Sequence, residues 1–195
     1  MRVIAGKYRS RQLKAPKTMN IRPTSDKVKG ALFNMLEPLE GCSVVDFYSG
    51  TGNLGIEALS RRAESVIFVD NGFEGLKLIK ENLETLGIVT GPQGPAKIMN
   101  LEVGRAFHSL YQEKLEFDIL LADPPYEVGV LKRIQHLLMQ YPILKPGGIL
   151  AVEHEAKDTE LEPDFPFPLV RQKKYGDTLL SLFKNATNLG PVGLD

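Results

Sequence analysis

The spacing of hydrophobic residues changes near residue 42. Beyond it, short unbroken apolar runs alternate with stretches in which apolar residues recur every three or four positions. The apolar runs are residues 43–47, 65–70, 96–100, 117–123 and 147–155. The periodic stretches between them are residues 54–62, 73–87, 103–112 and 128–141. Unbroken strands separated by amphipathic helices are typical of a mostly parallel sheet with helices on both faces, so we predict a doubly wound α/β fold.

The two ends of the chain follow other patterns. Residues 2–14 contain two short apolar segments around a cationic turn, which predicts a small β-hairpin. A helix with one apolar face follows, from a cap at residues 24–26 to Pro38. Residues 169–184 predict an antiparallel hairpin that turns at Gly176-Asp177. We therefore expect an N-terminal extension (1–40), a main domain (41–184) and a flexible tail without periodicity (185–195).

The composition excludes several classes of protein. The chain has 195 residues, of which 43% are hydrophobic and 25% charged, as in ordinary globular proteins. It has no apolar run of membrane-spanning length and no secretory leader pattern, so we expect a cytoplasmic protein without membrane contact. Cys42 is the single cysteine and the three histidines are scattered, so we expect neither a disulfide nor a metal site.

The net charge of zero conceals an asymmetry. Residues 1–30 contain nine Lys or Arg residues against Asp26 alone, a local charge of +8, so the rest of the chain carries −8. A basic segment on an acidic body favours contact with a polyanion such as nucleic acid. The alternative is that the segment folds onto the acidic body and neutralises it. The foremost candidates for phosphate contact are Lys7, Arg9, Arg11 and Arg22.

A glycine-rich motif follows the first strand of the main domain. Gly50, Gly52 and Gly55 form a Gly-x-Gly-x-x-Gly pattern at a predicted strand-to-helix turn. In such a turn glycines allow close backbone approach, and we expect the amides at the helix start to be free to meet a ligand. Asp46 lies at the carboxyl end of the preceding strand, four residues before Gly50. Its carboxylate would repel a pyrophosphate and would suit a ligand with an amine, such as the methionine part of S-adenosylmethionine.

Acidic residues also follow the next two strands. Asp70 lies 20 residues after Gly50, the distance at which a carboxylate reaches ribose hydroxyls in nucleotide-binding folds. Glu102 would lie near an adenine edge. The alternatives are that Asp70 caps the helix that starts near Phe73, that backbone amides satisfy Asp46, and that Glu102 caps a helix or is solvent-exposed.

A second motif follows the fourth strand of the main domain. Asp123-Pro124-Pro125-Tyr126 is a stiff turn, because the two prolines fix φ and supply no amide hydrogens. Asp123 Oδ and the Pro124 carbonyl could accept both hydrogens of an exocyclic amino group, and Tyr126 could stack on a purine. The alternative is a plain turn with Tyr126 as a lid. In a doubly wound sheet the fourth strand lies beside the first, so both motifs would share one crevice.

These residues resemble class I S-adenosylmethionine-dependent methyltransferases, and Asp-Pro-Pro-Tyr is similar to the motif of those that methylate amino nitrogens. With RVIAGKYRSRQLKAP, RPTSDKVKGALFNML and KKYGDTLLSLFK, the chain resembles the RsmD family, 16S rRNA guanine-N2 methyltransferases of bacteria. The resemblance implies a seven-stranded Rossmann-like sheet, S-adenosylmethionine as donor, and a 16S rRNA guanine, presented by a small subunit or its assembly intermediate, as acceptor. Residues 123–126 would hold that base. By position, the cofactor would be held by Asp46, Tyr48, Gly50, Gly52, Gly55, Asp70 and Glu102.

This sequence departs from the expected family pattern at three positions of the glycine turn, where Tyr48, Ser49 and Asn53 are larger or more polar. Other functions remain open from the residues alone. The same Asp-Pro-Pro-Tyr motif serves adenine-N6 methylation of DNA, although the short N-terminal extension leaves little room for a target-reading region. A non-catalytic nucleotide-binding RNA-associated protein and a purely structural ribosome-associated protein are further alternatives. We expect a monomer.

Overall fold

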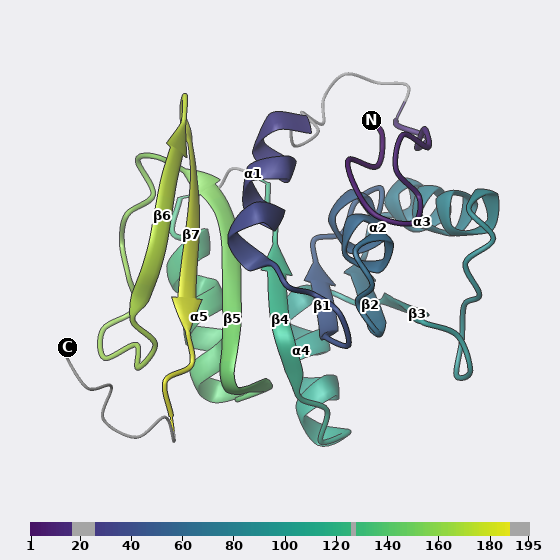
Figure 1. The fold of residues 1–195 in the computed structure, drawn as a ribbon. Helices are drawn as coiled ribbons and strands as arrows, with labels where there is room; N and C mark the ends of the chain where they lie inside the picture. Colours follow the sequence, from purple (N-terminus) through teal and green to yellow (C-terminus); the bar gives the residue numbers. More distant parts are fainter. Residues whose placement is uncertain (17–25, 126–127, 188–195) are drawn as a thin grey trace.

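The computed structural model describes residues 1–16, 26–125 and 128–187. Within these residues the chain forms five helices and one seven-stranded sheet (Figure 1). The helices are α1 (Asp26–Leu36), α2 (Asn53–Ser60), α3 (Phe73–Thr85), α4 (Val103–Gln112) and α5 (Val130–Gln140). The strands are β1 (Ser43–Phe47), β2 (Ser65–Asp70), β3 (Ala96–Asn100), β4 (Phe117–Ala122), β5 (Leu144–Glu155), β6 (Leu169–Tyr175) and β7 (Thr178–Lys184).

The sheet has the strand order β3-β2-β1-β4-β5-β7-β6. Strands β1 to β5 are parallel to one another, whereas β7 pairs antiparallel with both β5 and β6. The order reverses between β1 and β4, the point at which open α/β sheets bind their ligands. The predicted doubly wound fold, with an antiparallel hairpin at one edge, is confirmed.

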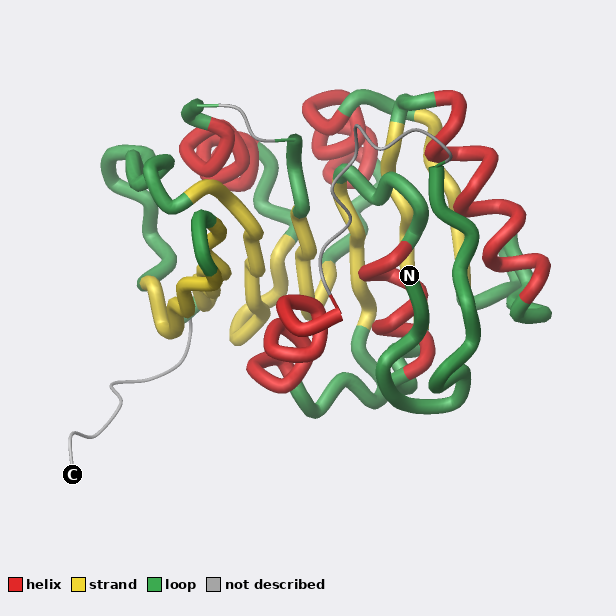
Figure 2. The backbone as a smooth tube through the Cα atoms, turned by 90° about the horizontal axis from the view of Figure 1, so that it is seen from above, coloured by secondary structure: helices red, strands yellow, loops and turns green. Residues whose placement is uncertain are grey.

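Helices cover both faces of the sheet (Figure 2). Each face has its own hydrophobic core. One core contains side chains of α1, α2 and α3, among them Phe33, Ile56 and Ile79. The other contains side chains of α4 and α5, among them Phe107 and Ile134. None of the helices in the described part of the chain is long and apolar enough to cross a membrane.

The central strands have the burial that their sequences predict. In β1, β2 and β4 nearly every residue is buried, because helices lie on both sides of these strands. The bounds of β1, β2, β3 and α4 coincide with the ranges expected from hydrophobic spacing. Strand β5 begins earlier than predicted, since Leu144 already pairs with Phe117 before the chain reaches Pro146.

Strand β6 differs from the central strands. It lies at one edge of the sheet, and all of its residues except the last are exposed. Three of them, Arg171, Lys173 and Lys174, are cationic. The edge therefore contributes charge to the surface and little to the core.

Residues 1–14 form a loop across α2 and α3 that we call the N-terminal strap. The predicted β-hairpin is present as a short antiparallel pairing: Arg2 and Gln12 form a bridge, and the amides of Val3 and Leu13 donate to the carbonyls of Arg11 and Met1. The pairing extends no further than this because the next amides, those of Ile4 and Ala5, donate to Glu57 of α2. Val3 and Leu13 pack into the same core as α1, α2 and α3, so the strap shares a core with the main domain.

Candidate functional site

The tips of β1 and β4 lie side by side. Phe47 of β1 and Ala122 of β4 are paired in register, so the next residues, Tyr48 and Asp123, leave the sheet next to each other. Asp123 therefore lies beside the tip of β1, as the doubly wound topology predicts, and its charge acts on Asp46. Strands β2 and β3 end in register at the same edge, with Asp70 opposite Asn100.

Two glycines of the turn have backbone angles that disfavour other residues. Gly50 has φ +53° and Gly52 has φ +78°, both in the left-handed region. Gly55 has a different requirement, since a Cβ there would lie 2.3 Å from the ring of Phe68 on β2. The three glycines therefore set the shape of the turn and the close approach of α2 to the sheet.

The amides of this turn bond to the protein itself. Gly50 N–H donates to Asp70 Oδ2 (2.7 Å), Gly55 N–H to Asp46 Oδ2 (2.9 Å), and Gly52 N–H to the Ser49 carbonyl (2.7 Å). Our expectation that these amides are free to meet a ligand is wrong for all three glycines, because strand-end carboxylates and a carbonyl already occupy them. Phosphate binds through free backbone N–H donors, so a turn whose amides are already hydrogen-bonded within the protein is poorly suited to bind it.

Asp46 is the most perturbed acid of the site. It is 1% exposed, and burial raises the pKa of its carboxyl group from 3.8 to about 8. The amide of Gly55 acts in the opposite direction, while the nearby carboxylates of Asp123 and Asp70 raise the pKa further. The backbone-amide alternative is therefore partly right, since Gly55 bonds to Asp46, but that bond does not compensate for burial. A cation placed beside Asp46 would favour its ionised form.

Asp70 and Glu102 both bind backbone amides at helix starts or turns. Asp70 accepts from Gly50 N–H and from Gly72 N–H (2.7 Å each), so it links the glycine turn to the start of α3. Glu102 caps α4 by accepting from Gly104 N–H and Arg105 N–H, and it also pairs with Arg133. The helix-capping alternative therefore holds for Glu102.

A small open pocket lies at the carboxyl ends of β1, β2 and β3. Three of the residues predicted for cofactor contact, Tyr48, Asp70 and Glu102, line it. Its other lining residues are Asn71, Leu101 and Val103. Sequence reasoning missed these three because they belong to no motif; their positions directly after β2 and β3 were the available signal.

The second motif is described up to Pro125. Asp123 is half-buried, Pro124 is buried and Pro125 is exposed. Tyr126 lies outside the described residues, as does Arg22 of the basic segment. Sequence reasoning also missed Asp158, which accepts from Gly129 N–H (3.0 Å) and Leu131 N–H (3.2 Å) and so fixes the start of α5 after the motif. Asp158 is 29 residues away from Gly129 and has no sequence signal.

Six of the seven described cations of the basic N-terminal segment fall into two groups, and the seventh, Lys27, is exposed on α1. Lys14 pairs with Glu81 and the buried Lys29 with Glu57, so the neutralising alternative holds for these two cations, whereas Arg2 pairs with Asp26 of the same segment.

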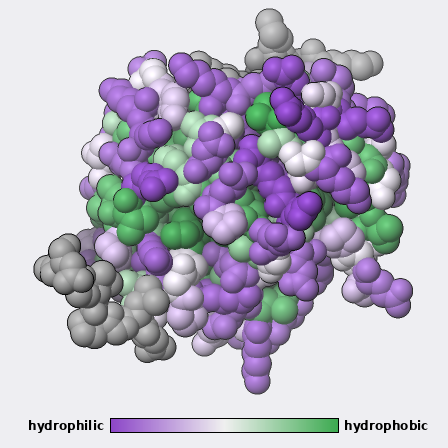
Figure 3. Space-filling view, viewed as in Figure 1, coloured by the Kyte–Doolittle hydropathy of each residue, from purple (hydrophilic) through white to green (hydrophobic). Residues whose placement is uncertain are grey.

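Lys7, Arg9 and Arg11 form the second group. They are exposed and make no ion pair within the described residues. They lie around the tip of the strap, where Lys7 N–H bonds to the carbonyl of Ser60, the last residue of α2. Hydrophilic side chains predominate on the part of the surface where Figure 1 places the strap (Figure 3).

Comparison with known proteins shows that the strap and the site both lie in a region that matches one protein family. A family model described as Conserved hypothetical protein 95 matches residues 1–184. The chain belongs to this family. The match also confirms the RsmD resemblance that the motifs carry.

Individual relatives of this family member match over nearly its whole length. It is 36% identical over 185 residues to the Bacillus subtilis protein named "Putative rRNA methyltransferase YlbH", covering 94% of this chain and 98% of that one. It is 33% identical to Ribosomal RNA small subunit methyltransferase D of Haemophilus influenzae, covering 95% and 94%. The solved structure titled "Putative methyltransferase yhhF from Escherichia coli" has a TM-score of 0.80 at 30% identity, covering 95% and 97%. The seven-stranded Rossmann-like fold is thereby confirmed.

The departures of this family member at the glycine turn have structural partners. Tyr48 adopts φ +58° at the tip of β1 and lines the pocket. The Ser49 hydroxyl donates to the Val69 carbonyl (3.1 Å) and accepts from the Val69 amide (2.9 Å), which ties the tips of β1 and β2 together. Asn53 Oδ1 accepts from Lys29 Nζ (2.7 Å). The polar residues thus make specific contacts at the turn.

Proposed function

We propose that this protein transfers a methyl group from S-adenosylmethionine to the exocyclic N2 amino group of a guanine in 16S ribosomal RNA. The observation that carries the proposal is the pairing of β1 with β4, which brings Asp46 and the glycine turn next to Asp123. The names of its relatives support an rRNA methyltransferase, and one of them acts on the small subunit by name.

The residues at the strand tips fit this donor better than a dinucleotide. Asp46 is buried without a cationic partner among the described residues and next to two further carboxylates, so it favours a ligand with positive charge. The amides of Gly50, Gly52 and Gly55 are already bonded, which disfavours a pyrophosphate. Asp70 has lone pairs left for a ribose diol, and Leu101 and Val103 give the pocket apolar walls for a base. Glu102, engaged with α4 and Arg133, borders the same pocket.

The acceptor is held by the second motif. Asp123 Oδ and the Pro124 carbonyl accept hydrogen bonds from the amino group, which favours the pyramidal geometry that the attacking nitrogen needs. Tyr126 stacks on the guanine after the base leaves its helix. S-adenosylmethionine supplies a methyl group on a cationic sulfur, so alignment matters more than strong base catalysis. The Asp123 carboxylate can accept the proton that the nitrogen loses.

The strap tip provides the contact with RNA phosphates. Lys7, Arg9 and Arg11 lie near the end of α2 that is remote from the glycine turn, with the length of α2, about 10–12 Å, between them. RNA bound at the tip would thus reach the crevice along the outside of α2. Arg22 belongs to the same basic segment and to the same proposal.

The test is a methyl-transfer assay with radiolabelled S-adenosylmethionine. The purified protein is incubated with small ribosomal subunits from cells that lack the enzyme, with free 16S rRNA, and with duplex DNA, and the labelled nucleoside is then identified. We expect N2-methylguanosine from 16S rRNA. Labelled N6-methyladenine in DNA would replace the proposal by its nearest rival, and binding of the donor without transfer to any substrate would favour a non-catalytic protein.

A further inference from the structure

A buried asparagine of α3 is hydrogen-bonded to the backbone of the glycine turn. Asn82 of α3 is 1% exposed, and its Nδ2 donates to the carbonyl of Thr51, between Gly50 and Gly52 (3.0 Å). The same side chain is bonded to the strap, since its Oδ1 accepts from Lys14 N–H (2.7 Å) and its Nδ2 donates to the Lys14 carbonyl (3.2 Å). Asn82 therefore connects the strap to the middle of the turn.

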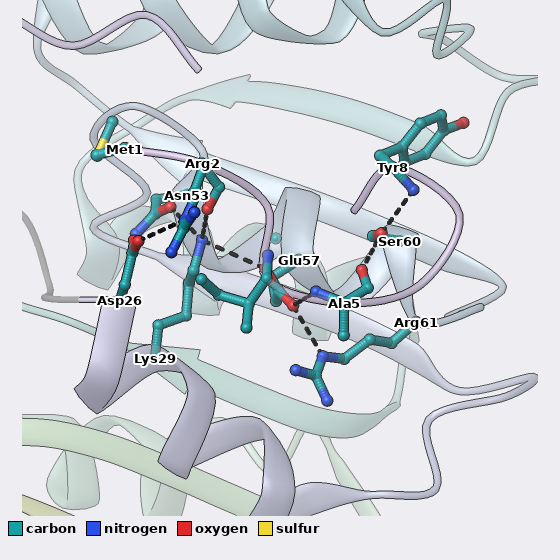
Figure 4. A network of polar contacts seen from close by, with 12 residues as sticks. Met1, Arg2, Ala5, Tyr8, Asp26, Lys29, Asn53, Glu57, Ser60 and Arg61 are labelled. Carbon is teal, nitrogen blue, oxygen red and sulfur yellow. Dashed lines mark hydrogen bonds and ion pairs between the residues drawn. The ribbon is translucent and has the colours of Figure 1, made fainter. Parts of the chain in front are cut away.

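A buried lysine makes a second connection at the other side of Gly52 (Figure 4). Lys29 of α1 is fully buried, and its Nζ donates to Asn53 Oδ1 and to the carbonyl of Arg2 (2.7 Å each). It also pairs with Glu57 Oε2 (3.3 Å). Glu57 in turn accepts from the amides of Ile4 and Ala5. Strap, α1 and α2 thus meet around one ammonium group, and that group holds the residue after Gly52.

Stability alone does not account for this arrangement. A buried ion pair contributes no more to folding than apolar side chains of similar volume, since both charges lose their hydration. A turn that contains Gly50 and Gly52 is conformationally permissive, however, and it needs restraints from outside if it is to have one shape. The two restraints act on Thr51 and Asn53, on either side of Gly52. Fixing a binding turn before the ligand arrives removes an ordering cost from binding.

We propose that Asn82 and Lys29 are positioning residues for the methyl donor. Through Thr51 and Asn53 they hold the glycine turn in its binding shape, and the N-terminal strap serves as their support. The inference rests on the proposed function, because it assigns the turn to S-adenosylmethionine. It gives the strap a second role besides RNA contact. This role depends on the backbone groups of the strap that bond to Asn82 and Lys29, and not on the cations at its tip.

The experiment compares two neighbouring substitutions on α3. Asn82→Ala removes the bond to Thr51 and leaves the Lys14 backbone groups without their partner. Glu81→Gln is the matched control, because Glu81 contacts the same strap residue through an exposed ion pair (2.9 Å) and does not touch the turn. Affinity for S-adenosylmethionine is measured by calorimetry, RNA affinity by filter binding, and KM and kcat by the methyl-transfer assay.

We expect Asn82→Ala to weaken donor binding about 5- to 50-fold, the range for a buried group that loses its partner. KM for the donor should rise in parallel, while RNA affinity and kcat at saturating donor stay within about twofold of native. Glu81→Gln should leave all four values unchanged. If Asn82→Ala does not fold, Asn82→Asp keeps the size and the acceptor for Lys14 N–H but faces the Thr51 carbonyl with an oxygen, and the same loss of donor affinity is expected.

Two outcomes would overturn the inference, and they are distinguishable. Native donor affinity in a folded Asn82 variant would show that the turn keeps its shape without the strap, and the proposed function would stand. Equal losses of donor affinity, RNA affinity and kcat would indicate general unfolding rather than positioning. A native protein that binds no S-adenosylmethionine would overturn the proposed function itself.

Discussion

Two buried carboxylates, Glu57 of α2 and Asp46 of β1, have opposite surroundings. Glu57, on the strap side, is fully enclosed and accepts from Ile4 N–H, Ala5 N–H and Arg61 Nε, with Lys29 as a further partner. Asp46, on the strand-tip side, has one hydrogen-bond donor within the described residues, the amide of Gly55. Its nearest charged neighbours are two other acids.

The comparison distinguishes a buried charge that holds elements in position from a buried charge that lacks a partner within the protein. A buried charge that the protein fully compensates holds elements together, as Glu57 does for the strap, α1 and α2. A buried charge that the protein leaves under-compensated must take up a proton or wait for a ligand, which is why the pKa of Asp46 is raised to about 8.

The strongest test of this comparison is Glu57→Ala. The substitution leaves the Lys29 ammonium buried without its counter-ion and two strap amides without an acceptor. We expect the free energy of unfolding to fall by about 3–5 kcal/mol in urea denaturation. Glu40→Ala removes an exposed partner of Arg62 and should cost less than about 1 kcal/mol. Similar small losses for both variants would contradict the structural role of Glu57.

The next largest effect, on the rate of methyl transfer, is expected for a substitution of Asp123. Asp123→Asn keeps the shape of the side chain but removes the charge that receives the proton of the amino group. We expect methyl transfer in a single turnover to slow about 100- to 1,000-fold, while donor affinity stays near native. The substitution also removes one of the carboxylates that raise the pKa of Asp46, so this pKa should fall. A turnover within tenfold of native would exclude Asp123 from the reaction.

Asp46→Asn tests the under-compensated charge directly. Without the negative charge, affinity for S-adenosylmethionine should fall about 10- to 100-fold, measured by calorimetry. Stability should respond in the opposite direction. In the native protein the folded state keeps a proton on Asp46 between pH 4 and pH 8 that the unfolded chain has released, so native stability falls across this window as pH rises. The neutral Asn variant lacks this loss. Its stability relative to the native protein, measured by denaturation, should therefore be higher at pH 8 than at pH 5.

The smallest effect is expected at the strap tip. Reversing Arg9 and Arg11 to Glu should weaken RNA binding about tenfold and reduce the slope of log K against log salt by about 2. The control is reversal of Arg105 and Lys114, which are also exposed and lack ion pairs among the described residues but lie at α4, on the other face of the sheet. Equal effects of both double variants would mean that only net charge matters.

The strands of the main domain could be predicted from the sequence because each strand appears as a local run of apolar residues. The apolar runs of β1, β2 and β3 end where the structure ends them, and the pairing of β1 with β4 follows from the doubly wound topology. Asp46, Asp70 and Asp123 could therefore be placed at one edge from spacing alone. That placement required no knowledge of side-chain contacts.

The buried network of the strap could not be predicted in this way. Lys29 has the sequence context of a surface cation and was counted with the basic segment, yet its partner Glu57 lies 28 positions further along and has no periodic relation to it. The bonded amides of Gly50 and Gly55 have the same origin, since their acceptors, Asp70 and Asp46, belong to β2 and β1. Long-range polar contacts leave no periodic signature, so they become visible only once the fold has formed.

Strand β6 has a consequence for how copies of this protein meet. At the edge of a sheet, unpaired backbone groups offer a template for a strand of another molecule. Arg171, Lys173 and Lys174 lie along this edge, so self-pairing of β6 would bring cations of two copies opposite each other, which is unfavourable. The edge strand thus provides an electrostatic barrier to self-association through a continuous sheet, and high ionic strength should lower that barrier.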